Sequence, residues 1–122
     1  LSPGTEFEIG NAEEWGEANA FEDATLSFVL HEIPREARIA AMSNACRVSR
    51  NAVHVMDIHE DYSPSQVMLL GEPYLNDYKK HILHDVNLVA RLNRMQLIRT
   101  DVVEKHVVCW RLSPMRSAIE VD

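Results

Sequence analysis

LSFVLHEIPREARIAAMSNACRVSRNAVHVMDIHED, residues 26–61, contains two apolar segments with a helix-like segment between them. The first apolar segment, residues 24–30, is rich in β-branched and aromatic side chains, which predicts a strand buried on both faces. The helix-like segment, 35–50, follows Pro34, a residue that the first turn of a helix tolerates. A second apolar run at 52–58 completes a strand–helix–strand unit, whose two strands are expected to be parallel.

The segments on either side of this unit predict further strands. Residues 5–9 alternate polar and apolar side chains up to Gly10, which indicates a short strand. Towards the other end, 95–100 and 106–112 are strand candidates whose short link fits an antiparallel hairpin. The sequence therefore predicts an α/β fold with a mostly parallel sheet and an antiparallel C-terminal hairpin.

The remaining segments are expected to form a loop, two helices and a tail. Residues 60–73 contain two prolines and a glycine, which indicates a loop. A helix that begins near Tyr74 is expected to break where Asp85 can cap a second helix. We expect one domain over 1–114 and a flexible tail at 115–122.

The composition argues against several kinds of partner and site. The formal net charge of the 122 residues is −7, which disfavours nucleic acid as a partner. No run of about 18 apolar residues is present, so no membrane span is expected. Cys46 and Cys109 lack a CxxC spacing, which predicts two reduced thiols in a reducing compartment. His81 and His84 have i, i+3 spacing without a third ligand nearby, so no metal site is expected.

Polar side chains follow three of the predicted strands. In open parallel sheets, ligands bind beyond the carboxyl ends of the strands. The residues at those ends are Asn11, Ala12, His31, Glu32, Asp57 and His59. Strand ends also meet water and are polar for that reason alone, so a ligand site and a solvated edge are both open interpretations.

Several motifs resemble those of the class I S-adenosylmethionine-dependent methyltransferases. They are, in chain order, the turn GNAE at 10–13, the strand and tip DATLSFVLHEIP at 23–34, the helix end CRV at 46–48 and the strand tip MD at 56–57. The later segments EPYLNDY, 72–78, and HVVCW, 106–110, also resemble this group. The likeness covers residues 6–112 and is greatest for the small-molecule type, which includes the ubiquinone and menaquinone methyltransferases and related enzymes of plastids and cyanobacteria.

The resemblance implies S-adenosylmethionine as the cofactor and assigns three residues to it. Asn11 and Ala12 would lie against the adenine, and an amide side chain can both accept from its amino group and donate to a ring nitrogen. Ser27 would lie near the amino-acid end of the cofactor.

The resemblance also implies a small molecule as the methyl acceptor. His31 and Glu32 would face the methyl group, with His31 as general base and Glu32 as the second choice for that role. Asp57 and His59 would line the substrate side of the site.

The sequence departs from the family's pattern in one large respect. The family's Gly-rich loop after its first strand, and the acidic residue that ends its second strand, have no counterpart here. The resemblance therefore implies a C-terminal portion, equivalent to strands three to seven, that binds the cofactor weakly or not at all by itself. The alternative is a non-catalytic α/β interaction module, either a degenerate or a split methyltransferase.

We expect a location in the cytoplasm or plastid stroma. We also expect self-association through the exposed sheet edge at 5–10 or through uncovered apolar helix faces.

Overall fold

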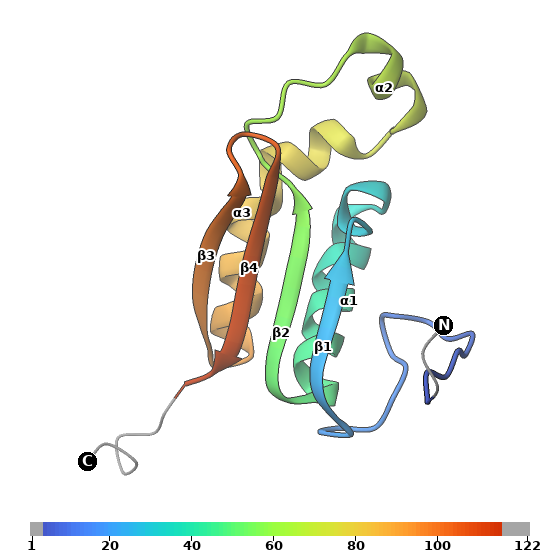
Figure 1. Ribbon diagram of the computed structural model, residues 1–122, viewed down its shortest axis with the longest axis vertical. Coiled ribbons are helices and arrows are strands. Elements are labelled where there is room, and N and C mark those ends of the chain that lie inside the picture. The colour runs from blue at the N-terminus through green and yellow to red at the C-terminus, as the bar shows by residue number, and fades with distance from the viewer. Residues whose placement is uncertain (1–3, 116–122) are drawn as a thin grey trace.

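The computed structural model describes residues 4–115, which form a four-stranded sheet with its helices (Figure 1). The strands lie in the order β1-β2-β4-β3 across the sheet. In chain order the elements are β1 (Phe21–Ser27), the 3-10 helix η1 (Leu30–Glu32), α1 (Arg35–Val48), β2 (Ser49–Ile58), α2 (Gln66–Gly71), α3 (Leu75–Leu92), β3 (Met95–Val103) and β4 (Val107–Pro114). Residues 1–3 and 116–122, which include most of the predicted tail, lie outside the described residues.

The strand–helix–strand unit is present as predicted. β1 and β2 are parallel, with Leu26 opposite Val55, and α1 connects them. β4 lies between β2 and β3 and is antiparallel to both, so that Trp110 is opposite Val55 on one side and Arg99 on the other. The predicted C-terminal hairpin is confirmed. The expectation of a mostly parallel sheet is wrong for the described strands, because the last strand inserts beside β2 and makes two of the three pairings antiparallel.

α1 and α3 lie together on one face of the sheet and cover the core (Figure 1). Val53 and Val55 of β2 and Trp110 of β4 point into this core and are at most 1% exposed. Burying one such side chain stabilises the fold by about 1.5–3 kcal/mol. The side chains of α3 that face them recur every three or four residues, as an amphipathic helix requires: Leu75, Tyr78, Ile82, Val86 and Val89.

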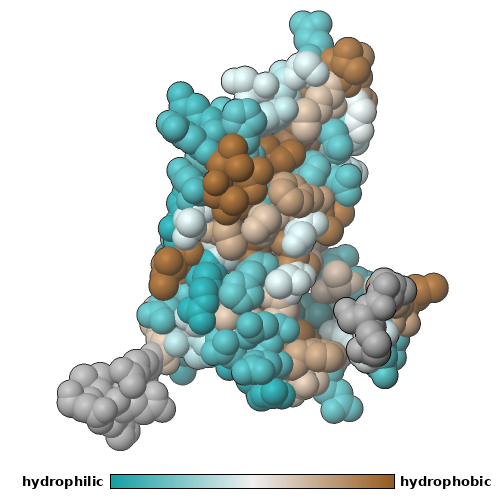
Figure 2. All heavy atoms as spheres, viewed as in Figure 1, coloured by the Kyte–Doolittle hydropathy of each residue, from teal (hydrophilic) through white to brown (hydrophobic). Residues whose placement is uncertain are grey.

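The opposite face of the sheet is covered by no element of the described chain. Thr25, His54, Arg111 and Ile98 lie side by side on the four strands, and none of the four is buried. The space-filling view from the same side shows hydrophilic and hydrophobic side chains mixed on this face (Figure 2). The expectation that the strand at 24–30 is buried on both faces is therefore wrong. The apolar residues 28–30 do not extend the strand. The strand ends at Ser27, and the residues after it form a turn.

The segment at 5–9 is not a strand. Phe7 and Ile9, its two apolar side chains, are 72% and 104% exposed. A short alternating pattern forms a strand only beside a partner strand, and the free edges of this sheet are β1 and β3. The edge predicted at 5–10 is therefore not an edge of the sheet, and self-association stays a prediction.

α3 continues through the position at which a helix break was expected. Asp85 does not cap a second helix; it is fully buried, and Arg35 Nε of α1 donates to its Oδ1 at 2.9 Å. The short helix α2 lies inside the predicted loop, where Ser65 Oγ accepts from the Met68 N–H at 3.1 Å. None of the helices in residues 4–115 combines the length and the apolar character that crossing a membrane requires.

Candidate active site

The chain turns sharply at the carboxyl end of β1. Phe28 has a φ of 55°, which is unusual for a bulky side chain, and its N–H donates to the Met56 carbonyl of β2 at 2.8 Å. The 3-10 helix η1 follows immediately and directs Leu30 and His31 inward, while Glu32 stays exposed. Such strained turns cost about 1–3 kcal/mol and are common at functional sites.

Asp57, near the end of β2, holds this turn in place. It is fully buried, its Oδ2 accepts from the Leu30 N–H at 3.0 Å, and its Oδ1 accepts from the Ile58 N–H at 2.7 Å. His31 Nδ1 lies 2.7 Å from the same Oδ1. Burial raises the pKa of the Asp57 carboxyl, although hydrogen bonds from Ile58, His31 and Leu30 lower it in part. Asp57, which the resemblance assigned to the substrate side, is therefore in direct contact with His31, the predicted base.

This contact determines which nitrogen of His31 is available. Because both oxygens of Asp57 accept hydrogen bonds from backbone N–H groups, Nδ1 of His31 is assigned as a third donor. Nε2 then carries the free lone pair. It points towards Glu72, whose Oε1 lies 3.9 Å away, and the Tyr78 ring stands edge-on to the imidazole with centroids 6.2 Å apart.

Two groups of side chains in the described range have the spacing to hold a metal ion. Ligand atoms of His31, Glu32 and Glu72 lie within 4.8 Å of one another, and the second group is His59, Glu60 and Asp61. In the first group the ligand nitrogen would be Nε2. Because one lone pair cannot hold both a metal ion and a proton, metal binding and general-base action exclude each other at His31.

His59 belongs to a different network from His31. Its Nδ1 accepts from the Asp61 N–H at 3.0 Å, and its Nε2 lies 3.0 Å from Arg99 Nη2. Arg99 also donates to Glu60 at 2.6 Å and to Asp101 at 3.0 Å. The hydrogen bond that Arg99 donates to Glu60 raises the pKa of Arg99, and the one that it donates to Asp101 lowers the pKa of Asp101. Both ring nitrogens of His59 are therefore engaged within the protein.

The three predicted cofactor residues are not gathered into one cluster with His31. Asn11 Oδ1 accepts from the Glu13 N–H at 2.9 Å, within a turn. The Ala12 carbonyl accepts from Asn44 Nδ2 at 3.0 Å, near the C-terminal end of α1. Ser27 is exposed at the end of β1. A groove of about 320 Å³ runs from Ala12 and Trp15 along β1 and α1 as far as Leu26.

Sequence reasoning did not assign Glu72 or Tyr78 to the site. Both lie in EPYLNDY, a segment of the methyltransferase resemblance in which nothing local points to His31. Tyr78 is fully buried on the core-facing side of α3. Its hydroxyl donates to the Ile58 carbonyl at 2.5 Å, which ties α3 to β2 beside Asp57.

No protein-family model and no curated protein sequence matches the chain. Solved structures do. A SAM-dependent methyltransferase from Methanosarcina mazei matches with a TM-score of 0.62 and 12% identity over 94% of this chain and 74% of that one. Magnesium protoporphyrin IX methyltransferase from Synechocystis PCC 6803, solved with bound SAH, matches with a TM-score of 0.52 and 12% identity over 87% of this chain and 49% of that one. The chain therefore has a fold found in SAM-dependent methyltransferases.

Proposed function

We propose that the chain is the acceptor-binding portion of an S-adenosylmethionine-dependent methyltransferase of the small-molecule, ubiquinone/menaquinone type. The observation that carries the proposal is the buried contact between His31 and Asp57, which leaves Nε2 free at the edge where β1 and β2 end. The fold shared with two methyltransferase structures supports it. Ligands of open α/β sheets bind at this edge.

In the proposed reaction His31 Nε2 takes the proton from an O–H or N–H of the acceptor while that atom bonds to the methyl carbon. S-adenosylmethionine supplies an electrophilic methyl group on a positively charged sulfur, and the electrons of the broken C–S bond stay on the sulfur. Asp57 keeps the imidazole oriented and stabilises its positive charge after proton transfer. Glu72, 3.9 Å from Nε2, adds a second negative charge beside that imidazolium. Glu32 is the second choice for the base, and it is exposed at the same turn.

The described residues fit only part of the cofactor. The groove beside β1 offers Ala12 and an aromatic ring, Trp15, to an adenine, and Ser27 lies one residue beyond its end at Leu26. The four glycines of the sequence are scattered at 4, 10, 16 and 71 and form no Gly-rich turn for the ribose and amino-acid groups. Asn11 already accepts from the Glu13 N–H through Oδ1, and its Nδ2 group remains a donor for an adenine.

This partial fit predicts weak cofactor binding by the 122 residues alone. One or two hydrogen bonds contribute about 0.5–1.5 kcal/mol each, and ordering the ligand costs several kcal/mol. We expect a Kd for S-adenosylmethionine no better than roughly millimolar. Titration calorimetry measures it, and a micromolar Kd for these residues alone would contradict the assignment of the cofactor pocket.

The test of the function uses the full gene product that contains these residues. It is incubated with S-adenosylmethionine labelled in its methyl group and with a panel of small quinols, phenols and amines. Transfer of label to one class of acceptor is the expected result. Failure of the full product to bind the cofactor would overturn the proposal.

That failure would favour the alternative, a non-catalytic interaction module. The observation in its favour is the uncovered face of the sheet between β1 and β3, where Ile98 is 53% exposed. Reading the coding sequence on both sides of the 122 residues distinguishes the two cheaply. A strand followed by a Gly-rich turn upstream supports the enzyme, and a start codon beside Leu1 supports the module.

A further inference from the structure

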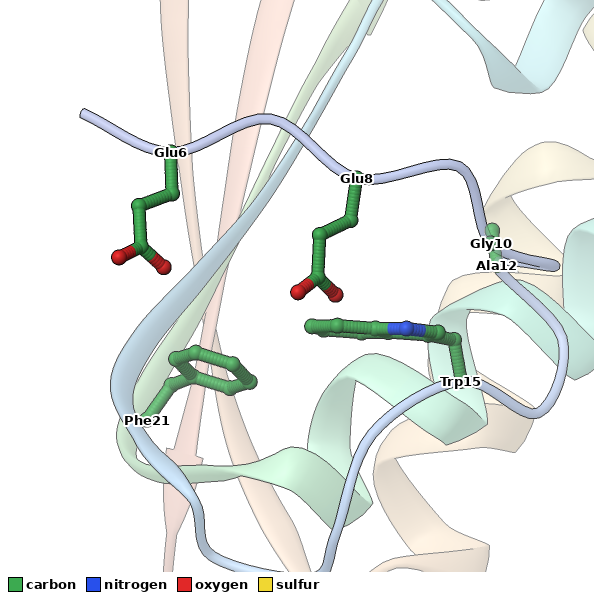
Figure 3. Close-up of a pocket in the computed structure, with 6 residues that line it drawn as sticks. All are labelled: Glu6, Glu8, Gly10, Ala12, Trp15 and Phe21. Carbon is green, nitrogen blue, oxygen red and sulfur yellow. The ribbon is translucent and has the colours of Figure 1, made fainter.

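A cavity of about 380 Å³ opens between the N-terminal segment and the start of β1, and His31 and Asp57 are not among the residues that line it (Figure 3). Its lining consists of two carboxylates, two aromatic rings and two small residues: Glu6, Glu8, Trp15, Phe21, Gly10 and Ala12. Nothing in the proposed methyl transfer uses the two glutamates. Ala12 and Trp15 also line the groove that was offered to an adenine, so it is the two glutamates that need an explanation of their own.

The rings of Trp15 and Phe21 form an aromatic floor of the cavity that is already ordered without a ligand. Trp15 and Phe21 are stacked, with ring centroids 5.6 Å apart and planes inclined by 22°, yet each is still 42% exposed. Gly10 allows the indole to approach the backbone, since a Cβ at that position would lie 2.5 Å from Trp15 Cδ1. Any other residue at position 10 would push the ring out of place.

Two side chains of α1 fix the turn that carries Trp15. Asn44 Nδ2 donates to the carbonyls of Ala12 and Trp15 at 3.0 and 2.9 Å. Arg47 Nη2 donates to the carbonyl of Gly16 at 2.6 Å, and Gly16 has a φ of 95° that favours glycine. These bonds hold the backbone that carries the indole, so a ligand does not have to order this turn.

The carboxylates above this floor create an electrostatic mismatch. Figure 3 shows Glu6 and Glu8 pointing from the N-terminal segment towards the two rings, with the Glu8 carboxylate over the Trp15 indole. The faces of aromatic rings are negative, so carboxylates and ring faces repel each other. Neither glutamate is in an ion pair with another residue of the range 4–115. A positive group placed between them is attracted by all four side chains.

We infer that this cavity is a binding site for an organic ammonium ion, with the cation held over Trp15 and Phe21 and neutralised by Glu6 and Glu8. Aromatic side chains combined with negative charge recognise quaternary and methylated ammonium groups. A divalent metal fits less well, because Glu6 and Glu8 belong to neither of the metal-competent groups in the described chain. A neutral purine would stack on Trp15 but carries no positive charge to match the two carboxylates.

The test follows the indole N–H signal of Trp15 by NMR while choline is added to the 122-residue chain. Trp15 is distinguished from Trp110, the other tryptophan, because Trp110 is 1% exposed and its signal should not move. The matched neutral ligand is 3,3-dimethylbutan-1-ol, which has the shape of choline without its charge. Variants are Glu6→Gln, Glu8→Gln and Trp15→Leu, and Glu17→Gln is the control, since Glu17 is exposed nearby but does not line the cavity.

Choline is expected to shift the Trp15 signal with a Kd in the range of roughly millimolar, and the neutral alcohol is expected not to. Glu6→Gln and Glu8→Gln should each weaken binding about fourfold, and added salt should weaken it further. Glu17→Gln should leave the Kd unchanged. Because the two glutamates are exposed, their variants keep the fold even if Trp15→Leu does not.

Three results would overturn the inference. Equal binding of choline and the neutral alcohol would show that charge plays no part. Binding of adenosine that is insensitive to Glu6→Gln and Glu8→Gln would assign the cavity to a purine. No shift of the Trp15 signal at about 50 mM choline would show that the cavity does not bind ammonium ions.

Discussion

His31 and Asp57, 26 residues apart in the chain, form a buried pair in which Nδ1 lies 2.7 Å from a carboxylate oxygen. The same carboxylate accepts from the backbone of Leu30 and Ile58, so it joins the turn after β1 to the end of β2. One side chain thus orders both the backbone of the candidate site and the orientation of its imidazole.

Asp57→Asn is expected to change the tautomer of His31. An amide can donate as well as accept, so Nδ1 is no longer held as the donor, and Nε2 gains a proton in part of the population. Nitrogen-15 NMR of the imidazole at neutral pH measures this. Asp61→Asn, at an exposed carboxylate, is the control. An unchanged His31 spectrum in Asp57→Asn would mean that Asp57 does not set the tautomer.

Tyr78→Phe is expected to destabilise the chain by about 1–2 kcal/mol, because the Ile58 carbonyl loses its hydroxyl donor inside the core. Burial raises the pKa of the Tyr78 phenol far above its usual range, so the hydroxyl stays a donor at any pH used for the measurement. Urea unfolding measures the change. Tyr74→Phe is the matched control, since Tyr74 is 39% exposed and should change stability by less than about 0.5 kcal/mol. Equal effects of the two variants would contradict the role of the hydrogen bond.

Asp77→Asn is expected to destabilise the chain in a pH-dependent way. Arg38, fully buried, donates to Asp77, and this hydrogen bond lowers the pKa of the carboxyl. A lowered folded-state pKa means that the stabilisation is present above the unfolded pKa, about 4, and is lost as the pH falls through the folded value. Because Asp77 is 44% exposed, solvent screening limits the loss at pH 7 to about 1–2 kcal/mol.

Urea unfolding at pH 7 and at several values below pH 4 tests this prediction. The difference between the native chain and Asp77→Asn should shrink as the pH falls, and Glu104→Gln, at an exposed side chain, should show no such trend. A difference that is the same at every pH would show that the charge of Asp77 is not responsible.

The two thiols are expected to react at different rates. Burial raises the pKa of the Cys46 thiol to about 11, so at pH 8 only about one molecule in a thousand carries the reactive thiolate. Cys109 is half-buried on the uncovered face of the sheet and should react with a disulfide reagent. In the native chain we expect one thiol to react rapidly with the reagent, and in urea we expect both to do so. If neither thiol reacts in the native chain, this face of the sheet is covered in solution.

The local parts of the fold could be predicted from the sequence. The apolar run at 52–58 and the helix formers at 35–50 act within a few residues, and they indicated β2 and α1 correctly. The place of β4 between β2 and β3 depends on contacts between strands far apart in the chain, which no local pattern records. Asp85 is a second example, because the sequence predicts a helix cap there. In the structure Asp85 lies within α3 and is bound by Arg35, which is 50 residues away in the chain.

The sequence indicated that His31 and Asp57 lie at one edge of the sheet, but not that they contact each other. The polar tips of the strands pointed to His31 and Asp57, because the carboxyl ends of parallel strands meet at one edge. The sequence could not show that Phe28 adopts a left-handed conformation, and that turn is what brings His31 onto Asp57. Glu72 reaches Nε2 from the link between α2 and α3, a segment without periodic signal.

The most direct test of the central claim, that His31 is the proton acceptor of a methyl transfer, compares kcat with cofactor affinity. His31→Ala and the control His84→Ala, at an exposed histidine of α3, are measured in the full gene product with its best acceptor. We expect His31→Ala to lower kcat by about 100-fold or more while the Kd for S-adenosylmethionine stays within about twofold, and we expect His84→Ala to change neither. An unchanged kcat, or an equal loss of kcat and cofactor affinity, would contradict it.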